Sequence, residues 1–397
     1  MKFLPYGKQW IDKEDVKAVI DVLRGDWLTQ GPAVEQFEKA LARYCGAKYA
    51  VAVSSGTSAL HIACLAAGIE RDDEVITSPI TFVASANCVL YCGGRPVFVD
   101  IDRESHNIDP GEVKKRITAR TKAIIPVHFS GLPCEMDLVS QTARAHNLTI
   151  IEDACHALGA RYKVNGKWIK VGSCRHSDMT VFSFHPVKHI TTGEGGAILT
   201  NKPGLYEKLL LFRNHGITKN SRKFTNKDMG FSSDSTVNPW YYEMQELGYN
   251  YRITDIQCAL GISQLKKLDI FISRRREIAS MYDRAFSDSA FIHISLQPAS
   301  KKSACHLYLV QIDFEKLAKS RSAVMNKLNK QGIGTQVHYI PVHLQPYYRT
   351  KFGFKPGDYP EAEVYYDKAL SLPLYPGMTD ADAKRVVNSL KECVNVK

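Results

Sequence analysis

Short apolar runs alternate with helix-sized segments between residues 49 and 184, and this alternation constrains the fold more than any other feature of the chain. Runs of this length, separated by helical stretches, predict an α/β fold with a mainly parallel sheet and helices on both faces. Ligands of such sheets bind at the carboxyl ends of the strands. The predicted strands are residues 49–53, 74–77, 96–101, 122–127, 148–151 and 179–184.

The length of 397 residues exceeds what one hydrophobic core usually requires. We expect a large domain at 1–272, including two N-terminal helices, and a smaller α+β domain at 273–397. The arginine triplet at 274–276 follows an apolar-periodic helix and is interpreted as its solvated end. In the smaller domain the pattern predicts strands at 306–314 and 335–339, and helices at 317–331 and 379–394.

Composition excludes several classes of partner. The formal net charge is +11, but Lys and Arg are spread along the chain without a nucleic-acid-binding motif. We therefore favour small molecules that carry phosphate as the anionic partner. No apolar run of about 18 residues and no secretory leader is visible, which predicts a cytoplasmic protein without a membrane partner. The ten cysteines lack Cys-x-x-Cys spacing, so we expect reduced thiols and no metal site.

A lysine stands on a short loop between two apolar runs at residues 180–200. The pattern predicts a strand, a tight crossing that carries Lys188, and a second strand. An amine attacks a carbonyl only when burial or neighbouring charge lowers its pKa. Lys188 is therefore either a positioned nucleophile or a surface lysine in a glycine-rich turn.

Polar residues also follow the other predicted strands. Ser55, Gly56 and Thr57 precede an Ala-rich helix, so they form either a phosphate site at a helix N-terminus or an ordinary cap. Phe82 lies among small residues and is interpreted as a stacking ring or as core. Asp153, with His156 three residues later, is either a helix N-cap or the partner of a cationic ring nitrogen.

Together these elements meet the needs of pyridoxal phosphate. This cofactor has an aldehyde that reacts with a lysine, a pyridine nitrogen that must stay protonated, and a phosphate that must be anchored. A phosphate cradle, an aromatic ring, a carboxylate and a later lysine occur in that order along the chain.

The chain resembles, over nearly its whole length, the DegT/DnrJ/EryC1/StrS sugar aminotransferases, which are fold-type I pyridoxal-phosphate enzymes. The stretches that carry the resemblance are Leu28-Thr29-Gln30-Gly31-Pro32, His185-Pro186-Val187-Lys188-His189-Ile190-Thr191-Thr192-Gly193-Glu194-Gly195-Gly196, Gly248-Tyr249-Asn250-Tyr251-Arg252 and Gln336-Val337-His338-Tyr339-Ile340-Pro341.

The resemblance implies a role for each matching residue. Lys188 matches the catalytic Schiff-base lysine, Asp153 the partner of the pyridine nitrogen, and Phe82 the stacking position. His156, Ser55, Gly56, Thr57 and Ser183 match further cofactor contacts. Asn250 matches a residue that completes the phosphate site of a neighbouring subunit, which implies a homodimer with shared sites. The positions expected to bind the nucleotide-sugar are Tyr6, Asp26, Trp27, Leu28, Thr29, Gln336, Val337, His338 and Tyr339.

Within the family, the resemblance is to enzymes of pseudaminic acid biosynthesis. It implies transfer of the amino group of glutamate to C4 of a UDP-linked 4-keto-6-deoxy-N-acetylhexosamine, giving UDP-4-amino-4,6-dideoxy-N-acetyl-β-L-altrosamine and 2-oxoglutarate. The alternatives are another nucleotide keto-sugar, a pyridoxal-binding regulatory protein and a non-catalytic nucleotide-binding module. Two features depart from the family pattern: residues 219–246 are long, and His189 stands where proline or asparagine is familiar.

Overall fold

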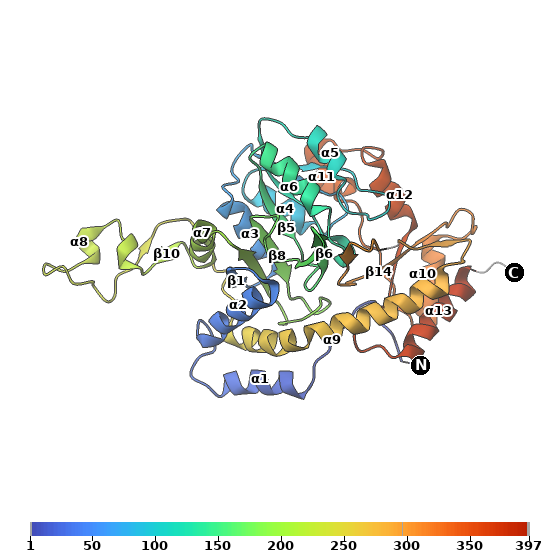
Figure 1. Ribbon diagram of the computed structural model, residues 1–397, viewed down its shortest axis with the longest axis horizontal. Coiled ribbons are helices and arrows are strands. Elements are labelled where there is room, and N and C mark those ends of the chain that lie inside the picture. The colour runs from blue at the N-terminus through green and yellow to red at the C-terminus, as the bar shows by residue number, and fades with distance from the viewer. Residues whose placement is uncertain (1, 296, 395–397) are drawn as a thin grey trace.

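A central sheet of seven strands organises the computed structural model, which describes residues 2–295 and 297–394 (Figure 1). The strand order is β1-β9-β8-β5-β4-β2-β3, and β9 alone runs antiparallel to its neighbours. The predicted mainly parallel sheet is confirmed. Its strands are β1 (Tyr49–Val53), β2 (Glu74–Thr77), β3 (Arg95–Phe98), β4 (Thr121–Ile125), β5 (Thr149–Asp153), β8 (Met179–Ser183) and β9 (Gly196–Thr200).

Helices cover both faces of the sheet. Successive residues of a strand point to opposite faces, so each strand contributes to two cores. In β1, Val51 and Val53 face a core formed with α3 (Gly56–Ala66), α4 (Ala84–Tyr91) and α7 (Pro203–Arg213). Ala50 and Ala52 face the opposite core, formed with α2 (Pro32–Cys45), α5 (Pro110–Lys115), α6 (Met136–Ala145) and α9 (Asp255–Phe286). The sheet is therefore buried on both sides, and its strand ends remain available for ligands.

The long helix α9 begins at a capping box of Thr254 and Gln257 and continues for 32 residues. The expected domain boundary between residues 272 and 273 lies inside this helix, and the division into domains stays a prediction. The helix also explains why the interpretation of the arginine triplet is wrong for Arg275. Neighbouring helical residues point about 100° apart, and Arg275 points inwards, where it is 1% exposed and donates to the carbonyls of His306 and Leu374 at 3.1 and 2.8 Å.

The C-terminal part packs around a second core. The predicted strand at 335–339 is wrong: only Gln336 pairs, in an isolated bridge with Ser371, and the chain then leaves the sheet. The helix predicted from 317 begins at Arg321, because Ser320 caps it there. The elements are β12 (Ile292–His293), β14 (Tyr308–Ile312), β15 (Ala369–Leu372), α10 (Arg321–Lys330), α11 (Pro346–Phe352), α12 (Pro360–Lys368) and α13 (Asp380–Val394).

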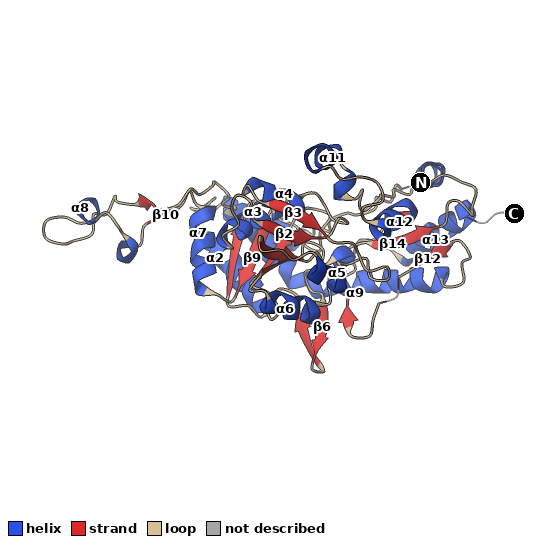
Figure 2. Cartoon of the chain, turned by 90° about the horizontal axis from the view of Figure 1, so that it is seen from above, coloured by secondary structure: helices blue, strands red, loops and turns tan. Residues whose placement is uncertain are grey.

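Smaller elements pack around, or project from, these cores. Helix α1 (Lys13–Leu23) packs against α9. The strands β6 (Arg161–Val164), β7 (Lys167–Lys170) and β13 (Lys301–Lys302) form a separate three-stranded sheet. Residues 219–246 project away from the body and carry α8 (Lys227–Gly230) and β11 (Glu243–Met244), which pairs with β10 (Ile217–Thr218) (Figures 1 and 2). Across residues 2–295 and 297–394, no helix has the length and apolar character needed to cross a membrane.

Candidate active site

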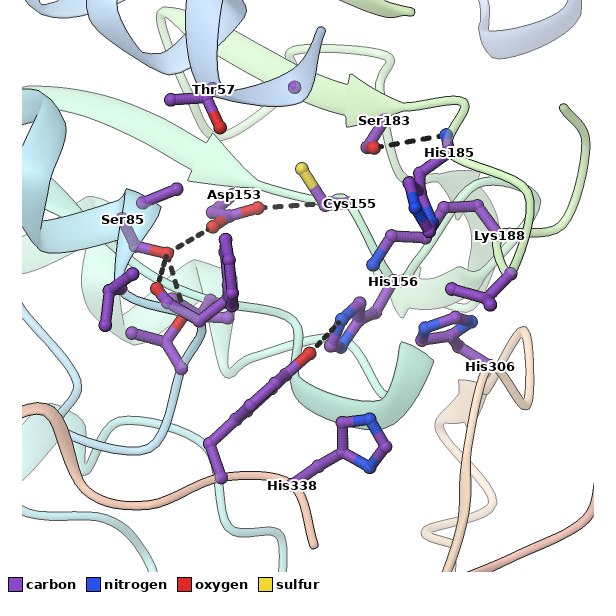
Figure 3. A pocket seen from close by; sticks show the side chains of 18 of the residues that line it. Thr57, Ser85, Asp153, Cys155, His156, Ser183, His185, Lys188, His306 and His338 are labelled. Atoms are coloured by element: carbon purple, nitrogen blue, oxygen red, sulfur yellow. Dashed lines mark hydrogen bonds between the residues drawn. The ribbon is translucent and has the colours of Figure 1, made fainter. Parts of the chain in front are cut away.

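A cavity of about 630 Å³ opens at the carboxyl ends of the strands, between the sheet and the C-terminal part (Figure 3). Most residues predicted to form the site line it. They are Tyr6, Ser55, Gly56, Thr57, Phe82, Asp153, His156, Ser183, Lys188, Gln336, Val337, His338 and Tyr339. The structure thus gathers side chains that are up to 333 positions apart in the sequence, from Tyr6 to Tyr339.

Lys188 lies on the loop that joins β8 to β9, as predicted. The two strands pair directly, Ser183 opposite Gly196, so the loop between them is closed at its base. The Lys188 side chain points towards the middle of the cavity (Figure 3), and no described residue forms a hydrogen bond with its amine. Burial lowers the pKa of Lys188 below its ordinary 10.5, although the neighbouring carboxylate of Asp153 acts in the opposite direction. The amine is therefore available to a ligand and is easier to deprotonate than an ordinary lysine.

Asp153 faces the cavity at the carboxyl end of β5. Its carboxylate accepts a hydrogen bond from the Ser85 hydroxyl at 2.5 Å and another from the backbone N–H of Cys155 at 3.2 Å. The Ser85 hydroxyl is also 2.7 Å from that of Thr81. These contacts fix the carboxylate, which is 6% exposed. Sequence reasoning missed Ser85, although it follows the same strand end as Phe82.

The N-terminus of α3 forms the opposite wall. Ser55 caps this helix, accepting from the Ser58 N–H at 3.0 Å, so the interpretation as a cap is confirmed. The first N–H groups of a helix have no partner within the helix, and Gly56 and Thr57, which carry two of them, line the cavity. A Cβ atom at Gly56 would lie 2.8 Å from the Cβ of Ser183, so glycine is required for the close approach of α3 to β8. The residues that cap α3 can therefore also take part in an anion-binding site.

Aromatic and imidazole rings, among them Phe82, Tyr339, His156 and His306, also line the cavity. Phe82 is 58% exposed, so its interpretation as a core side chain is wrong. The Tyr339 hydroxyl lies 3.1 Å from Nε2 of His156, and the ring of His306 lies 4.3 Å from that of His156. Burial, followed by the positive charge of Lys188, lowers the pKa of His156 well below its ordinary value. These imidazoles therefore stay neutral, and His306, which no sequence pattern singled out, joins the site from the C-terminal part.

His338 is neutral for the same reason. Burial lowers its pKa to about 3, and its Nδ1 lies 2.7 Å from the Ser371 hydroxyl. His189, for which the sequence offered no role beyond packing beside Lys188, is absent from the cavity lining in the described chain. It is 3% exposed and its Nε2 lies 3.1 Å from the carbonyl oxygen of Ala304, so it packs the Lys188 loop against the C-terminal part.

The residues present fit pyridoxal phosphate. Nδ1 of His156 is buried and has no hydrogen-bond partner among the described residues, as expected for a donor reserved for a ligand. The helix N-terminus beside Gly56 suits a phosphate, the fixed carboxylate of Asp153 suits a protonated ring nitrogen, and the free amine of Lys188 suits an aldehyde.

Two predicted groups lie elsewhere. Asn250 and the stretch Asp26 to Thr29 do not contribute to the cavity lining within the part of the chain that the structure describes. Residues 28 and 29 lie at the beginning of α9, where Thr29 forms a bridge with Thr254 and the Asp255 N–H donates to the carbonyl of Leu28 at 3.0 Å. Asn250 instead forms a bridge with Asn214.

Comparisons with known proteins agree with this geometry. Residues 9–391 match the model of the DegT/DnrJ/EryC1/StrS aminotransferase family. The spore coat polysaccharide biosynthesis protein SpsC of Bacillus subtilis is 42% identical, covering 99% of this chain and 97% of that protein. Among solved structures, Helicobacter pylori PseC, an aminotransferase involved in the biosynthesis of pseudoaminic acid, has a TM-score of 0.88 and 35% identity, covering 99% of both chains. Spr1654 of Streptococcus pneumoniae, solved in PLP and PMP forms, has a TM-score of 0.87 and 28% identity, covering 99% of this chain and 98% of that chain.

Proposed function

The chain belongs to the DegT/DnrJ/EryC1/StrS aminotransferase family, and from this premise we propose that it transfers the amino group of glutamate to the C4 carbonyl of a UDP-linked 4-keto-6-deoxy-N-acetylhexosamine. The product would be UDP-4-amino-4,6-dideoxy-N-acetyl-β-L-altrosamine for pseudaminic acid biosynthesis. The observation that carries amino transfer is the convergence of Lys188, Asp153 and the α3 N-terminus on one cavity. The similarity to PseC supports the choice of sugar. The cytoplasm is the compartment that this proposal assigns.

Pyridoxal phosphate, the cofactor of this family, supplies an aldehyde that condenses with amines and a ring that accepts an electron pair from a carbon losing its proton. The Lys188 amine would hold the aldehyde carbon, and Asp153 would keep the ring nitrogen protonated. Phe82 would lie against the ring. The first N–H groups of α3, with the hydroxyls of Ser55, Thr57 and Ser183, would hold the phosphate.

Lys188 also moves the proton. Its lowered pKa allows the neutral Nζ to take a proton from Cα of the donor amino acid, and later to deliver one to C4 of the sugar. The neighbouring imidazoles remain neutral because burial lowers the pKa of His156, His306 and His338. His156 and His338 contact the hydroxyls of Tyr339 and Ser371, and none of the three imidazoles competes with Lys188 for the proton.

A second copy of the chain is part of this proposal. Neither Asn250 nor residues 26–29 line the cavity of their own chain in the described structure, because Asn250 pairs with Asn214 and residues 28–29 are bonded to the beginning of α9. A homodimer in which both groups border the cavity of the other copy would bring Asn250 to the phosphate and residues 26–29 to the nucleotide. This arrangement accounts for both groups at once.

SpsC supports a second candidate substrate. That relative is named for spore coat polysaccharide biosynthesis, and a shared fold and site do not determine the sugar. The alternative is therefore amino transfer to another nucleotide-linked keto-sugar, by the same side chains.

One set of incubations separates these candidates. The protein, pyridoxal phosphate and glutamate are mixed with UDP-linked and dTDP-linked 4-keto sugars, and NMR of the product identifies the aminated carbon and its configuration. We expect amination at C4 of the UDP-N-acetyl sugar. Lys188→Ala serves as the inactive variant that still binds the cofactor without covalent attachment. Turnover in Lys188→Ala would overturn the assignment of the lysine, and amination of dTDP sugars alone would overturn the assignment of the substrate. No turnover with any sugar would favour a regulatory protein.

A further inference from the structure

The small sheet of β6, β7 and β13 has two very different faces. Its inner face carries Tyr162, Val164 and Ile169, which pack against the core shared with α2 and α9. Successive strand residues alternate between faces, so the register of the three strands assigns the outer face, here called the basic face. It carries Arg161, Lys163, Trp168, Lys170 and Lys302. The basic face therefore combines four cations with one indole ring and contains no acidic residue.

The cations of the basic face lie close together without counter-charges. Arg161 is directly opposite Lys302 on one side and Lys170 on the other. Like charges opposite each other destabilise a sheet. Lys301, on the inner face, forms an ion pair with Glu135 at 2.6 Å, whereas no described carboxylate pairs with the four outer cations. An anionic ligand on the basic face would relieve this repulsion.

Protection of the sheet edges accounts for only part of this charge. Lysines on edge strands commonly prevent pairing with other chains, which explains Lys170 on β7 and Lys302 on β13. Arg161 and Lys163 lie on β6, which is the central strand and has no free edge. A ligand of the face explains these two residues better than protection of the edges does.

The surroundings of Trp168 indicate the kind of ligand. The Nζ atoms of Lys163 and Lys302 lie 5.1 and 4.6 Å from the centroid of its ring. Bases of single-stranded nucleic acid stack on a free aromatic face, whereas this ring already contacts two ammonium groups. None of the exposed large apolar side chains of the described chain lies on these strands, so a protein partner would lack the anchors that dominate protein interfaces. A surface of anionic lipid headgroups requires only cations and an interfacial aromatic residue.

We propose that the basic face binds the surface of a membrane that contains anionic phospholipids. The hairpin of β6 and β7 projects from the body (Figure 2), where it can meet a flat surface. None of the residues of the basic face lines the active-site cavity, so the inference is independent of the proposed function. It differs from the expectation of no membrane partner, because that expectation rested on the absence of long apolar runs, and peripheral binding requires none.

Vesicle sedimentation tests this binding with the full-length protein and its cofactor. The probes are vesicles of phosphatidylcholine alone and vesicles of phosphatidylcholine mixed with phosphatidylglycerol. We expect binding to the mixed vesicles at low ionic strength, no binding to phosphatidylcholine alone, and release from the mixed vesicles by added salt. Binding to both kinds of vesicle, binding to neither, or binding that salt does not weaken would overturn the proposal.

Charge-neutralising variants locate the contact. Lys163→Gln/Lys302→Gln should weaken binding to the mixed vesicles by about 30-fold, because each cation near an anionic membrane contributes about 5-fold. The control pair Lys355→Gln/Lys384→Gln makes the same change in net charge at exposed lysines elsewhere and should bind as the wild type does. Thermal melting and the glutamate half-reaction should match the wild type in both pairs, which shows that neither is misfolded. Equal weakening by the two pairs would assign the binding to net charge and overturn the proposal.

Two further measurements distinguish a membrane from other polyanions. Poly-glutamate and a homopolymeric RNA should bind more weakly than the mixed vesicles. Tighter binding of either polymer that is lost in Lys163→Gln/Lys302→Gln would overturn the lipid in favour of that polymer. Mixed vesicles with brominated acyl chains should quench the fluorescence of the wild type more than that of Trp168→Phe. Equal quenching would mean that another surface faces the membrane and would overturn the proposal.

Discussion

Replacing Gly196 with alanine tests how the phosphate cradle is built. Gly196 begins β9 and pairs with Val53 of β1 and Ser183 of β8. A Cβ atom at this position would lie 2.4 Å from the carbonyl oxygen of Ser55 and 2.7 Å from the nitrogen of Gly56. Both atoms are backbone, at the cap and the first residue of α3, so no side-chain rotation relieves the overlap. The backbone must separate by more than about half an ångström.

The strain should fall on the cradle. Strand β9 lies between β1 and β8 and is buried throughout, whereas the N-terminus of α3 borders the cavity. Overpacking of this kind costs about 1–3 kcal/mol. If this free-energy cost is borne by the cofactor-bound state, the dissociation constant of pyridoxal phosphate rises by about 10- to 100-fold.

The assay is a titration of apoprotein with pyridoxal phosphate, followed by cofactor absorption, with thermal melting of the apoprotein beside it. Gly204→Ala is the matched control, because outside its own helical turn no described residue lies within 4 Å of its added Cβ, and alanine suits its position in α7. Equal cofactor affinity in Gly196→Ala and Gly204→Ala would refute the reasoning, even if Gly196→Ala melts earlier, because the sheet would then have absorbed the strain.

Two further predictions concern charge in the cavity. The folded-state pKa of Lys188 lies below 10.5 because of burial. Between that pKa and 10.5 the unfolded chain binds more protons than the folded one, so the apoprotein gains stability as pH rises towards 10.5. Lys188→Met should abolish this pH dependence of the unfolding free energy in urea and be more stable at neutral pH, whereas parallel stability curves of the two proteins would contradict the burial of the amine. Asp153→Asn should lower the rate of the glutamate half-reaction by about 100-fold, and Ser85→Ala, which removes only the 2.5 Å hydrogen bond to that carboxylate, should lower it less; an equal loss in both would assign the effect to orientation alone.

The sequence predicted strands and helices correctly where the buried residues are apolar and the exposed residues are polar. Strand β5 shows the limit, because it was predicted to end at residue 151 and continues to Asp153. Its last two residues are acidic but buried. Glu152 lies 2.6 Å from Nε2 of His128 and accepts from the Thr180 hydroxyl at 2.9 Å. Hydropathy patterns do not detect a carboxylate whose partners come from distant segments, so the strand end was placed too early.

The site was predictable where residues follow strand ends, because parallel strands bring their carboxyl ends to one edge. Lys188, Asp153 and the Ser55 region follow that rule. His306 does not: it reaches the cavity from the C-terminal part, through packing between regions far apart in the sequence. Arg275 failed for a related reason, since a charge triplet on a helix contains one residue that faces inwards, and its carbonyl partners at 305–306 and 374 are not visible in local sequence.

The position of Asn250 outside its own cavity leads to a test of shared active sites. If Asn250 acts on the neighbouring cavity, a dimer formed from one Lys188→Ala chain and one Asn250→Ala chain contains one site with both native residues and one with neither. Mixing the two inactive variants under conditions that exchange subunits should therefore restore about a quarter of wild-type activity, because half of the dimers are mixed and half of their sites are native. If Asn250 serves its own chain, every site lacks one residue and mixing restores nothing. The two geometries thus predict different activities from the same pair of proteins.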